Sequence, residues 1–231
     1  MLAYASVKQV LNKGHVRLVD QYGDELRIVN FARASYGREK ETFEASDAKL
    51  IEFLLKNRHG TPFEAVDFTF HIKAPITVAR EWFRHRIASY NEISGRYVEL
   101  EDDFYVPQPK RIRRQVGKPG AYTYEPITDV DTKVKAVSTM IEAYEASYSA
   151  YKALLALGIA KDLARNVLAL GLYTQFYFKV NARALMNFLS LRNAPSAMEE
   201  IQEYAEALEE RMKESLPHTH AAFVKHGRVA P

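Results

Sequence analysis

Apolar and polar residues alternate strictly in Val66–Lys73. A period of two is that of a β-strand with one buried face. The residues expected to face a core are Val66, Phe68, Phe70 and Ile72. A second strand is predicted at Leu172–Val180, which is rich in aromatic residues, and a shorter one at residues 14–19.

Other segments carry apolar residues at helical spacing. They are residues 24–36, 47–56, 128–157, 161–170, 182–191 and 196–216, followed by a short terminal helix. Thr128–Asp131 offers an N-cap for the longest of them, and Gly158 a stop. Thr61–Glu64 and Ser196–Glu199 both have the pattern of a capping box, which predicts that a helical turn begins at each.

A further helix is predicted to begin at Pro75 and to continue as far as Arg84. On such a helix Arg80 and Arg84 would share one face, and Glu81 and His85 would share another.

Residues 101–127 are rich in Pro, Gly, Tyr and basic residues and show no sustained period. A long loop or insertion is therefore predicted there. No internal repeat and no domain boundary is evident. Together the elements predict an α+β fold, in which one helix-rich mixed domain of residues 1–231 contains a small antiparallel-type sheet.

Composition narrows the class of protein. A chain of 231 residues with 47% hydrophobic and 26% charged residues can bury a sizeable core. No apolar run approaches the roughly 20 residues that span a bilayer, and the N-terminus lacks a signal-peptide pattern, so we expect a cytoplasmic protein without membrane contact. A net charge of +3 predicts a mixed surface and does not indicate nucleic-acid binding.

The chain has no cysteine. This excludes disulfides, thiolate-bound zinc, iron–sulfur clusters and a thiol nucleophile. The seven histidines show no HExxH or comparable spacing, so no metal site is predicted. No GxGxxG or P-loop pattern is present, so any flavin would be held outside those two frameworks.

The segment Arg84–Tyr97 concentrates cations and hydrogen-bond donors. Alone, Arg84–Arg86 would be typical of a solvated helix end. However, the turn Ser94–Arg96 can bring backbone N–H groups, a hydroxyl and a guanidinium to one phosphate. The two features together predict a nucleotide site.

A second segment, Asn181–Arg192, would by itself be an ordinary amphipathic helix. Asn181 would lie near its N-terminus, and Arg183 and Asn187 would share one face.

Both segments resemble one family. Arg84–Tyr97 resembles the RHR…S.NE.SGR signature of flavin-dependent thymidylate synthases, and Asn181–Arg192 resembles their NAR…N….R block. The resemblance extends over most of residues 25–226. It implies an enzyme that methylates dUMP to dTMP with bound FAD, NADPH as reductant and 5,10-methylenetetrahydrofolate as carbon donor. It also implies a homotetramer with active sites shared between subunits.

The same resemblance implies which residues hold each ligand. Those expected at the flavin are Ser35, His59, Thr61, Arg84, His85, Arg86, Asn91, Glu92, Asn181, Arg183 and Asn187. Those expected at the nucleotide are Glu81, Arg84, Glu92, Ser94, Gly95, Arg96, Arg165 and Arg192. Glu81 stands where the family often has glutamine, and a carboxylate there would repel a nucleotide anion unless an arginine pairs with it.

Arg192 is the residue expected to be catalytic. The resemblance places it at the pyrimidine, where a guanidinium beside N3 and O2 of uracil would stabilise the charge of an ionised N3. That charge would raise the electron density at C5, the carbon to be methylated. Such activation would replace the addition of a thiolate at C6, which a chain without cysteine cannot make.

Two other hypotheses stay open. A nucleotide- or RNA-binding module would use the arginines and the basic run Lys110–Lys118, and its binding would weaken with salt. A structural α+β oligomer with a basic cleft would bind neither flavin nor dUMP. The basic run itself is either a solvated loop or a phosphate contact for NADPH, folate glutamates or nucleic acid.

Overall fold

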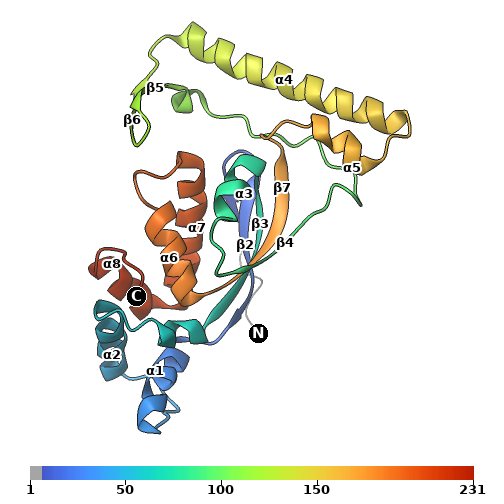
Figure 1. Cartoon of the computed structure of the whole chain (residues 1–231). Coiled ribbons are helices and arrows are strands. Elements are labelled where there is room, and N and C mark those ends of the chain that lie inside the picture. Colours follow the sequence, from blue (N-terminus) through green and yellow to red (C-terminus); the bar gives the residue numbers. More distant parts are fainter. Residues whose placement is uncertain (1–6) are drawn as a thin grey trace. The chain divides into compact units, whose positions relative to one another are not determined.

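The computed structural model describes residues 7–231 (Figure 1). Their contacts divide into two compact units. The first unit comprises the residues up to Ala74, Val78–Glu92 and Thr174–Pro231, and the second comprises Pro75–Thr77 and Ile93–Tyr173. The single domain expected for residues 1–231 stays a prediction, and residues 1–6 of it lie outside the described residues.

A five-stranded sheet with the order β1-β2-β3-β7-β4 organises the first unit. Its strands are β1 (Lys8–Val10), β2 (Gly14–Tyr22), β3 (Asp67–Pro75), β7 (Tyr173–Asn181) and β4 (Ser89–Glu92). The pairs β1/β2, β2/β3 and β4/β7 are antiparallel. β7 also runs antiparallel to β3, because Ala182 N donates to Val66 O at one end and Ile76 N donates to Leu172 O at the other.

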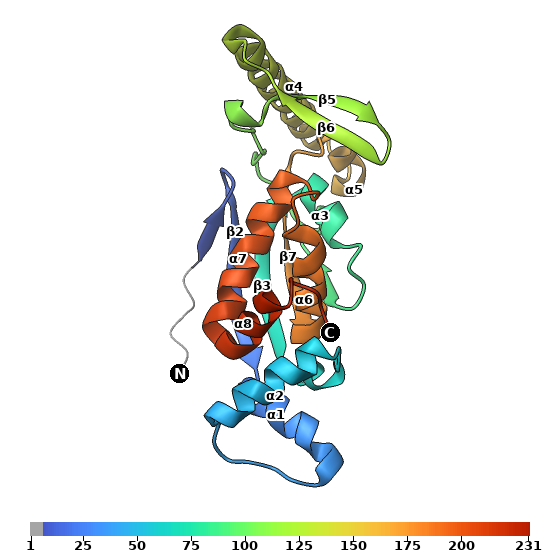
Figure 2. The same cartoon turned by 90° about the vertical axis from the view of Figure 1, so that its left-hand side faces the viewer.

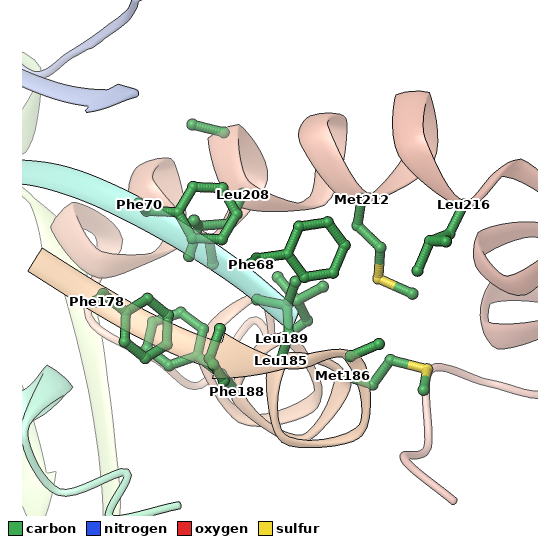
Figure 3. Close-up of a cluster of buried hydrophobic side chains, with 14 of the residues drawn as sticks. Phe68, Phe70, Phe178, Leu185, Met186, Phe188, Leu189, Leu208, Met212 and Leu216 are labelled. Carbon is green, nitrogen blue, oxygen red and sulfur yellow. The ribbon is translucent and has the colours of Figure 1, made fainter. Parts of the chain in front are cut away.

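One face of this sheet is buried under two helices. α6 (Ala182–Arg192) and α7 (Glu199–Ser215) lie over β3 and β7 (Figures 1 and 2). Phe68 and Phe70 of β3 and Phe178 of β7 meet side chains of both helices, among them Leu185 and Leu208 (Figure 3). Burying one such side chain is worth about 1.5–3 kcal/mol, so this layer is the main stabilising feature of the unit.

The remaining helices of the first unit are short. They are α1 (Glu25–Arg33), α2 (Ala45–Lys56) and α8 (Pro217–Lys225), with the 3-10 turns η1 (Ala34–Tyr36) and η2 (Thr61–Ala65). α1 begins at Asp24, whose side chain accepts a hydrogen bond from Arg27 N at 3.0 Å. η2 packs against α6, which brings Glu64 of η2 next to Arg183 of α6.

The second unit is built around one long helix, α4 (Val130–Ala156). Asp129 caps it by accepting a hydrogen bond from Thr132 N at 2.8 Å, and Gly158 follows its end with a φ of 78°. The other elements are η3 (Pro109–Arg111), β5 (Arg113–Lys118), β6 (Ala121–Pro126), α5 (Lys161–Ala164) and η4 (Arg165–Val167). α3 (Ile76–Trp82) begins in the second unit and ends in the first.

The predicted α+β fold with a small antiparallel sheet is confirmed. The strands predicted at Val66–Lys73 and Leu172–Val180 are β3 and β7, and the long predicted helix is α4. The loop predicted at residues 101–127 is wrong in part, because β5 and β6 pair there as a hairpin. At residues 161–170 only α5 and the 3-10 turn η4 form, and β1 and β4 were not predicted.

The helix predicted to begin at Pro75 forms as α3, but it is shorter than predicted. Pro75 ends β3, and α3 ends at Trp82. Arg84 N and His85 N then donate to acceptors only three residues back, which closes a turn. Arg84 and His85 therefore do not share helix faces with Arg80 and Glu81.

The helical turns predicted at Thr61–Glu64 and Ser196–Glu199 form as η2 and the start of α7, but neither predicted capping box does. Gly60, which has no side chain to form a cap, is the N-cap of η2, and the Glu64 carboxylate pairs with Arg183. α7 begins at Glu199 with Met198 as its N-cap, so Glu199 is the first helical residue rather than the third.

Candidate active site

The turn after α3 presents Arg84, His85 and Arg86. Tyr90 of β4 fixes this turn, since its hydroxyl donates to His85 O at 2.8 Å and its ring stacks on Phe178. Burial raises the pKa of Tyr90, so the hydroxyl stays a hydrogen-bond donor. The buried sheet thus holds a polar turn in one place.

α6 supplies a second wall. Asn181 is its N-cap, with Oδ1 accepting from Ala184 N at 2.9 Å, as expected for a residue at the helix N-terminus. Helical spacing brings Arg183, Asn187 and Leu191 to the side away from the core. The core side carries Leu185, Met186, Phe188 and Leu189.

The turn and α6 border a cavity of about 860 Å³. Small-molecule sites have volumes of roughly 300–1,000 Å³, so the space suits a cofactor or nucleotide. Seven residues singled out in the sequence line it: Arg84, His85, Arg86, Asn181, Arg183, Asn187 and Arg192. Four of these are arginines, and Glu64 is the carboxylate among the lining residues, so the cavity favours an anionic ligand.

The guanidinium of Arg192 is held in place by His85 and Glu81. Its Nε lies 3.0 Å from His85 Nε2, and its Nη1 lies 3.4 Å from Glu81 Oε2. Its Nη2 donates to Glu81 O at 3.5 Å. The side chain is only 19% exposed. Glu81 therefore has the arginine partner that a carboxylate at this position requires.

The contact between Arg192 and His85 requires a neutral imidazole. Burial, followed by the charges of Arg192 and Arg84, lowers the pKa of His85 to about 4. Near neutral pH, His85 Nε2 accepts the hydrogen bond from Arg192 Nε, and the ring proton is on Nδ1. The positive charge at this point of the wall belongs to Arg192.

Arg183 is held by partners that the sequence analysis did not place in the site. Its Nη1 donates to Glu64 Oε1 at 2.6 Å, and its Nε donates to Pro231 O at 2.9 Å. Both partners line the cavity with Ala230. In the sequence, the Thr61–Glu64 pattern indicates that Glu64 caps a helix. Nothing near Glu64 in the sequence indicates that it pairs with Arg183 instead.

Gly60 makes room for that arginine. A Cβ at Gly60 would lie 2.3 Å from Arg183 Nε and 2.6 Å from its Cζ. Any larger residue would displace the guanidinium from Glu64 and Pro231. The absence of a side chain at Gly60 therefore allows Arg183 to pack against the backbone there.

Other predicted flavin residues lie elsewhere in the first unit. His59 and Thr61 border a separate hollow of about 240 Å³. Ser35 is exposed, and its hydroxyl donates to Ala32 O at 3.0 Å. Asn91 and Glu92 are exposed on β4, where Glu92 Oε1 accepts from Thr174 Oγ1 at 2.6 Å. Their ligand roles stay predictions.

The second unit gathers the remaining predicted nucleotide residues. Ser94 Oγ accepts a hydrogen bond from Arg96 N at 3.3 Å, which shapes the predicted Ser-Gly-Arg turn. Gly95 is buried, and a Cβ there would lie 3.3 Å from Arg165 Cδ and 2.9 Å from Leu100 Cδ1. The turn and Arg165 are therefore neighbours, although 70 residues of chain separate Gly95 from Arg165.

Within residues 7–231, no group of three or more histidine or acidic side chains is placed to hold a metal ion. In the same range, no helix has the length and apolar character needed to cross a membrane.

Comparison with known proteins identifies the family. Residues 17–218 match the family model described as thymidylate synthase complementing protein. The flavin-dependent thymidylate synthase of Thermosipho africanus is 48% identical over 217 residues, which cover 94% of this chain and 93% of that protein. The chain belongs to the flavin-dependent thymidylate synthase family. The enzyme of Thermus thermophilus is also 48% identical, over 94% of this chain and 78% of its own length.

Solved structures of a related enzyme agree with this family. The UMP/dUMP methylase PolB from Streptomyces cacaoi, bound with 5-Br dUMP, has a TM-score of 0.88 and 40% identity, covering 96% of this chain and 100% of its own. Its complex with 5-Br UMP has a TM-score of 0.87 and 39% identity, covering 97% and 99% of the two chains. As a flavin-dependent thymidylate synthase, the chain is an enzyme.

Proposed function

We propose that this enzyme converts dUMP to dTMP, with FAD as cofactor, NADPH as reductant and 5,10-methylenetetrahydrofolate as carbon donor. The observation that carries the proposal is Arg192, clamped by Glu81 and His85 in the wall of a cavity with three further arginines. The dUMP analogue bound by PolB supports a uracil nucleotide as substrate.

The overall reaction balances with these co-substrates. dUMP, the methylene-folate, NADPH and one proton give dTMP, tetrahydrofolate and NADP⁺. The methylene carbon forms a bond to C5 of uracil and breaks its bonds to the folate nitrogens. The hydrogen at C5 leaves as a proton, and a hydride completes the methyl group.

The residues that line the cavity fit a flavin. The guanidiniums of Arg84, Arg86 and Arg183 and the amide of Asn187 are donors for phosphate and ring carbonyl oxygens. The apolar side chains of the lining include Ile87, Val180 and Leu191, which suit a ring system. When bound, FAD supplies the hydride chemistry, while these residues hold it and exclude water.

Arg192 would act on the uracil ring. Its guanidinium stabilises negative charge at N3 and O2 and so raises the nucleophilicity of C5. Because Glu81 and His85 already fix the guanidinium, little reorganisation is needed as that charge develops. A protonated His85 would repel Arg192, so the low pKa of His85 keeps the arrangement intact.

UMP is a second candidate substrate. PolB is described as a UMP/dUMP methylase, and its structure with 5-Br UMP is nearly as similar to this chain as that with 5-Br dUMP. Both nucleotides offer the same uracil edge to Arg192, so the choice between them depends on contacts with the sugar.

The visible absorption spectrum of the purified protein tests the cofactor. An oxidised-flavin spectrum that bleaches on addition of NADPH in the presence of dUMP is the expected result. Product analysis under the same conditions, with methylene-folate and either dUMP or UMP, then identifies the substrate by the ratio of kcat/KM. A protein that stays colourless after incubation with FAD would contradict the proposal and favour a nucleotide-binding module.

A further inference from the structure

The chain that follows α8 returns to the cavity of the first unit, and residues 228–231 are called the return segment below. Ala230 and Pro231 of this segment line the cavity, and Pro231 is buried. The end marked C lies beside α6 in both views (Figures 1 and 2). The match to the family model ends at residue 218, so the family does not by itself explain this part of the site.

Two residues in the left-handed region turn the chain from α8 toward α6. Gly227 has a φ of 77° and Arg228 a φ of 56°. Gly227 N donates to Val224 O at 3.1 Å. Arg228 N donates to Phe223 O at 2.9 Å, which completes the Schellman pattern of a helix end. Residues other than glycine rarely adopt such a φ, and Arg228 does so while its guanidinium donates to the buried carboxylate of Glu209 at 2.9 Å.

The return segment then follows one face of α6. The Ser190 hydroxyl lies 2.6 Å from Arg228 O, and Arg183 Nε donates to Pro231 O at 2.9 Å. Seven residues of a helix rise by about 10 Å, and three residues of extended chain span about 10 Å. The two contacts therefore fit a segment that runs antiparallel to α6. Asn187 lies on the same face of the helix and lines the cavity.

The Ser190 hydroxyl has one proton and two acceptors within reach. Arg228 O is 2.6 Å away and Met186 O is 2.8 Å away. Met186 O is a carbonyl in the interior of α6, where a backbone N–H already bonds to it. Donation to Arg228 O adds a contact that the helix alone does not provide, and it joins the return segment to α6.

Pro231 O adds a second contact that holds Arg183. The ion pair of Arg183 with Glu64 is open to solvent, since the two side chains are 44% and 41% exposed. An exposed pair of this kind contributes little by itself. With Pro231 O as a further acceptor, two N–H groups of the guanidinium are bonded and the others remain for a ligand. The return segment thus orients Arg183 in the cavity wall.

We propose that the return segment is part of the flavin site, and that Ser190 and Gly227 are the positioning residues that keep it there. The inference rests on the proposed function, because it takes FAD as the ligand of the cavity. Through Pro231 O the segment fixes Arg183 for a phosphate or ring oxygen of the cofactor. If the segment were loosened, Arg183 would be mobile, and FAD would have to order it on binding.

Two substitutions loosen the return segment without changing a residue that lines the cavity. Ser190→Ala removes the hydroxyl that bonds to Arg228 O. Gly227→Ala places a Cβ at a φ of 77°, where it is strained although no described atom lies within 4 Å of it. We expect each to raise the Kd of FAD by about threefold to tenfold, which corresponds to the loss of one hydrogen bond. Equilibrium dialysis of the full chain against FAD, followed by visible absorbance, measures the Kd.

Two controls repeat the same chemistry in the second unit. Ser138 of α4 also has a hydroxyl that donates to a carbonyl of its own helix, Lys135 O, at 3.1 Å. Gly158 ends α4 with a φ of 78° and with the same pair of backbone hydrogen bonds as Gly227. Ser138→Ala and Gly158→Ala should leave the Kd of FAD unchanged. Ser190→Thr keeps a hydroxyl and should bind FAD as the wild type does.

Urea unfolding of the same variants separates affinity from stability. A purely structural role of the return segment would lower the free energy of unfolding and leave the Kd of FAD unchanged. Unchanged FAD affinity in both Ser190→Ala and Gly227→Ala would overturn the inference, as would an equal loss of affinity in the two controls.

The inference and the proposed function can fail separately. A wild-type enzyme that binds FAD but forms no dTMP would contradict the proposed function, while the comparison of Kd values would still test the return segment. Normal dTMP formation, with the same Kd in all variants, would leave the proposed function standing and refute the inference. A wild-type protein without affinity for FAD would contradict both.

Discussion

Arginine side chains are usually exposed and flexible, but the side chain of Arg192 is held in one position by its neighbours. A free arginine loses rotamer freedom on ordering, which costs up to about 2 kcal/mol. Here Glu81 and His85 already fix the guanidinium in the folded chain. A ligand that meets Arg192 therefore does not have to order it.

Replacing Arg192 by alanine is expected to slow dTMP formation by about 10²–10³-fold, the usual effect of removing one donor from a developing charge. Flavin content, measured by the ratio of visible to ultraviolet absorbance, should stay near that of the wild type. Arg192→Lys should recover only part of the rate, since an ammonium lacks the planar fork. Arg17→Ala, on the sheet, is the control. Normal turnover in Arg192→Ala would contradict the role proposed for this residue.

A pair of histidines makes stability depend on pH. His15 Nε2 lies 2.9 Å from His71 Nδ1 on the polar side of the sheet. Burial, followed by the charges of His71, Lys73 and Arg17, lowers the pKa of His15 from its ordinary value of 6.5 to about 4. Between about pH 6.5 and 4 the unfolded chain binds more protons at this site than the folded chain, so stability falls as the pH falls through that window.

Urea unfolding at about pH 7.5 and about pH 5 measures this dependence. His15→Gln should lose less stability between the two conditions than the wild type. His59→Gln changes an exposed histidine and should lose as much as the wild type. If His15→Gln shows the full wild-type loss, the coupling assigned to His15 is wrong.

The sequence pattern singled out many of the residues that line the cavity, but not the residues that hold Arg183 in its wall. Arg84–Arg86 line one cavity together with Asn181, Arg183, Asn187 and Arg192, as expected if the two segments serve one site. The contacts of Glu64 and Pro231 with Arg183 could not be predicted, because they join residues far apart in the chain. The roles of the lining residues toward each ligand stay predictions.

At the level of elements, Glu209 of α7 joins three segments. Its carboxylate accepts from Asn193 Nδ2 at 2.6 Å and from Arg228 Nη2 at 2.9 Å, and it lies 2.9 Å from His220 Nε2. Burial alone would raise the pKa of Glu209, yet the hydrogen bonds from Arg228, Asn193 and His220 hold it below its ordinary value. Asn193 is the C-cap of α6, so this carboxylate also supports the helix end that carries Arg192.

Glu209→Gln is expected to lower the free energy of unfolding by about 1–3 kcal/mol, because the hydrogen bonds that Arg228, Asn193 and His220 make to the buried carboxylate are weakened or lost. The midpoint of urea unfolding measures the loss. Glu206→Gln changes an exposed carboxylate on the same helix and should have little effect. A loss of the same size in both variants would show that Glu209 has no special role.

Helices and strands with a regular spacing of apolar residues were predictable from the sequence. The hairpin, which depends on the backbone conformation of its turn, was not. β3, β7 and α4 follow clear patterns. The β5–β6 hairpin turns at Pro119–Gly120, and proline cannot adopt the positive φ of the turns that usually join hairpins. Gly117 and Gly120 both take positive φ and provide the necessary curvature. A Pro-Gly pair in a basic segment therefore gave little sign of strands.

On the scale of the molecule, the first half of α4 suggests association between copies. Val130, Val134 and Ile141 follow one another at helical spacing, and each is at least 38% exposed. An apolar stripe of this kind is typical of a subunit interface. It supports the homotetramer expected from the family, which stays a prediction.

Sedimentation or light scattering tests this interface. Val134→Glu combined with Ile141→Glu is expected to lower the oligomeric state, because it places two charges on the stripe. Lys135→Glu changes the charge of an exposed neighbour of Val134 and should leave the state unchanged. An unaltered assembly in the double variant would exclude this stripe as a subunit contact.

Trp82, the single tryptophan of the chain, is fully buried in the core. Its ring centroid lies 4.8 Å from that of Phe188, which in turn lies 4.7 Å from that of His85 in the cavity wall. Oxidised flavin absorbs light where tryptophan emits it. The unlabelled enzyme therefore carries its own fluorescent reporter, and quenching of one indole should report the arrival of the cofactor in real time.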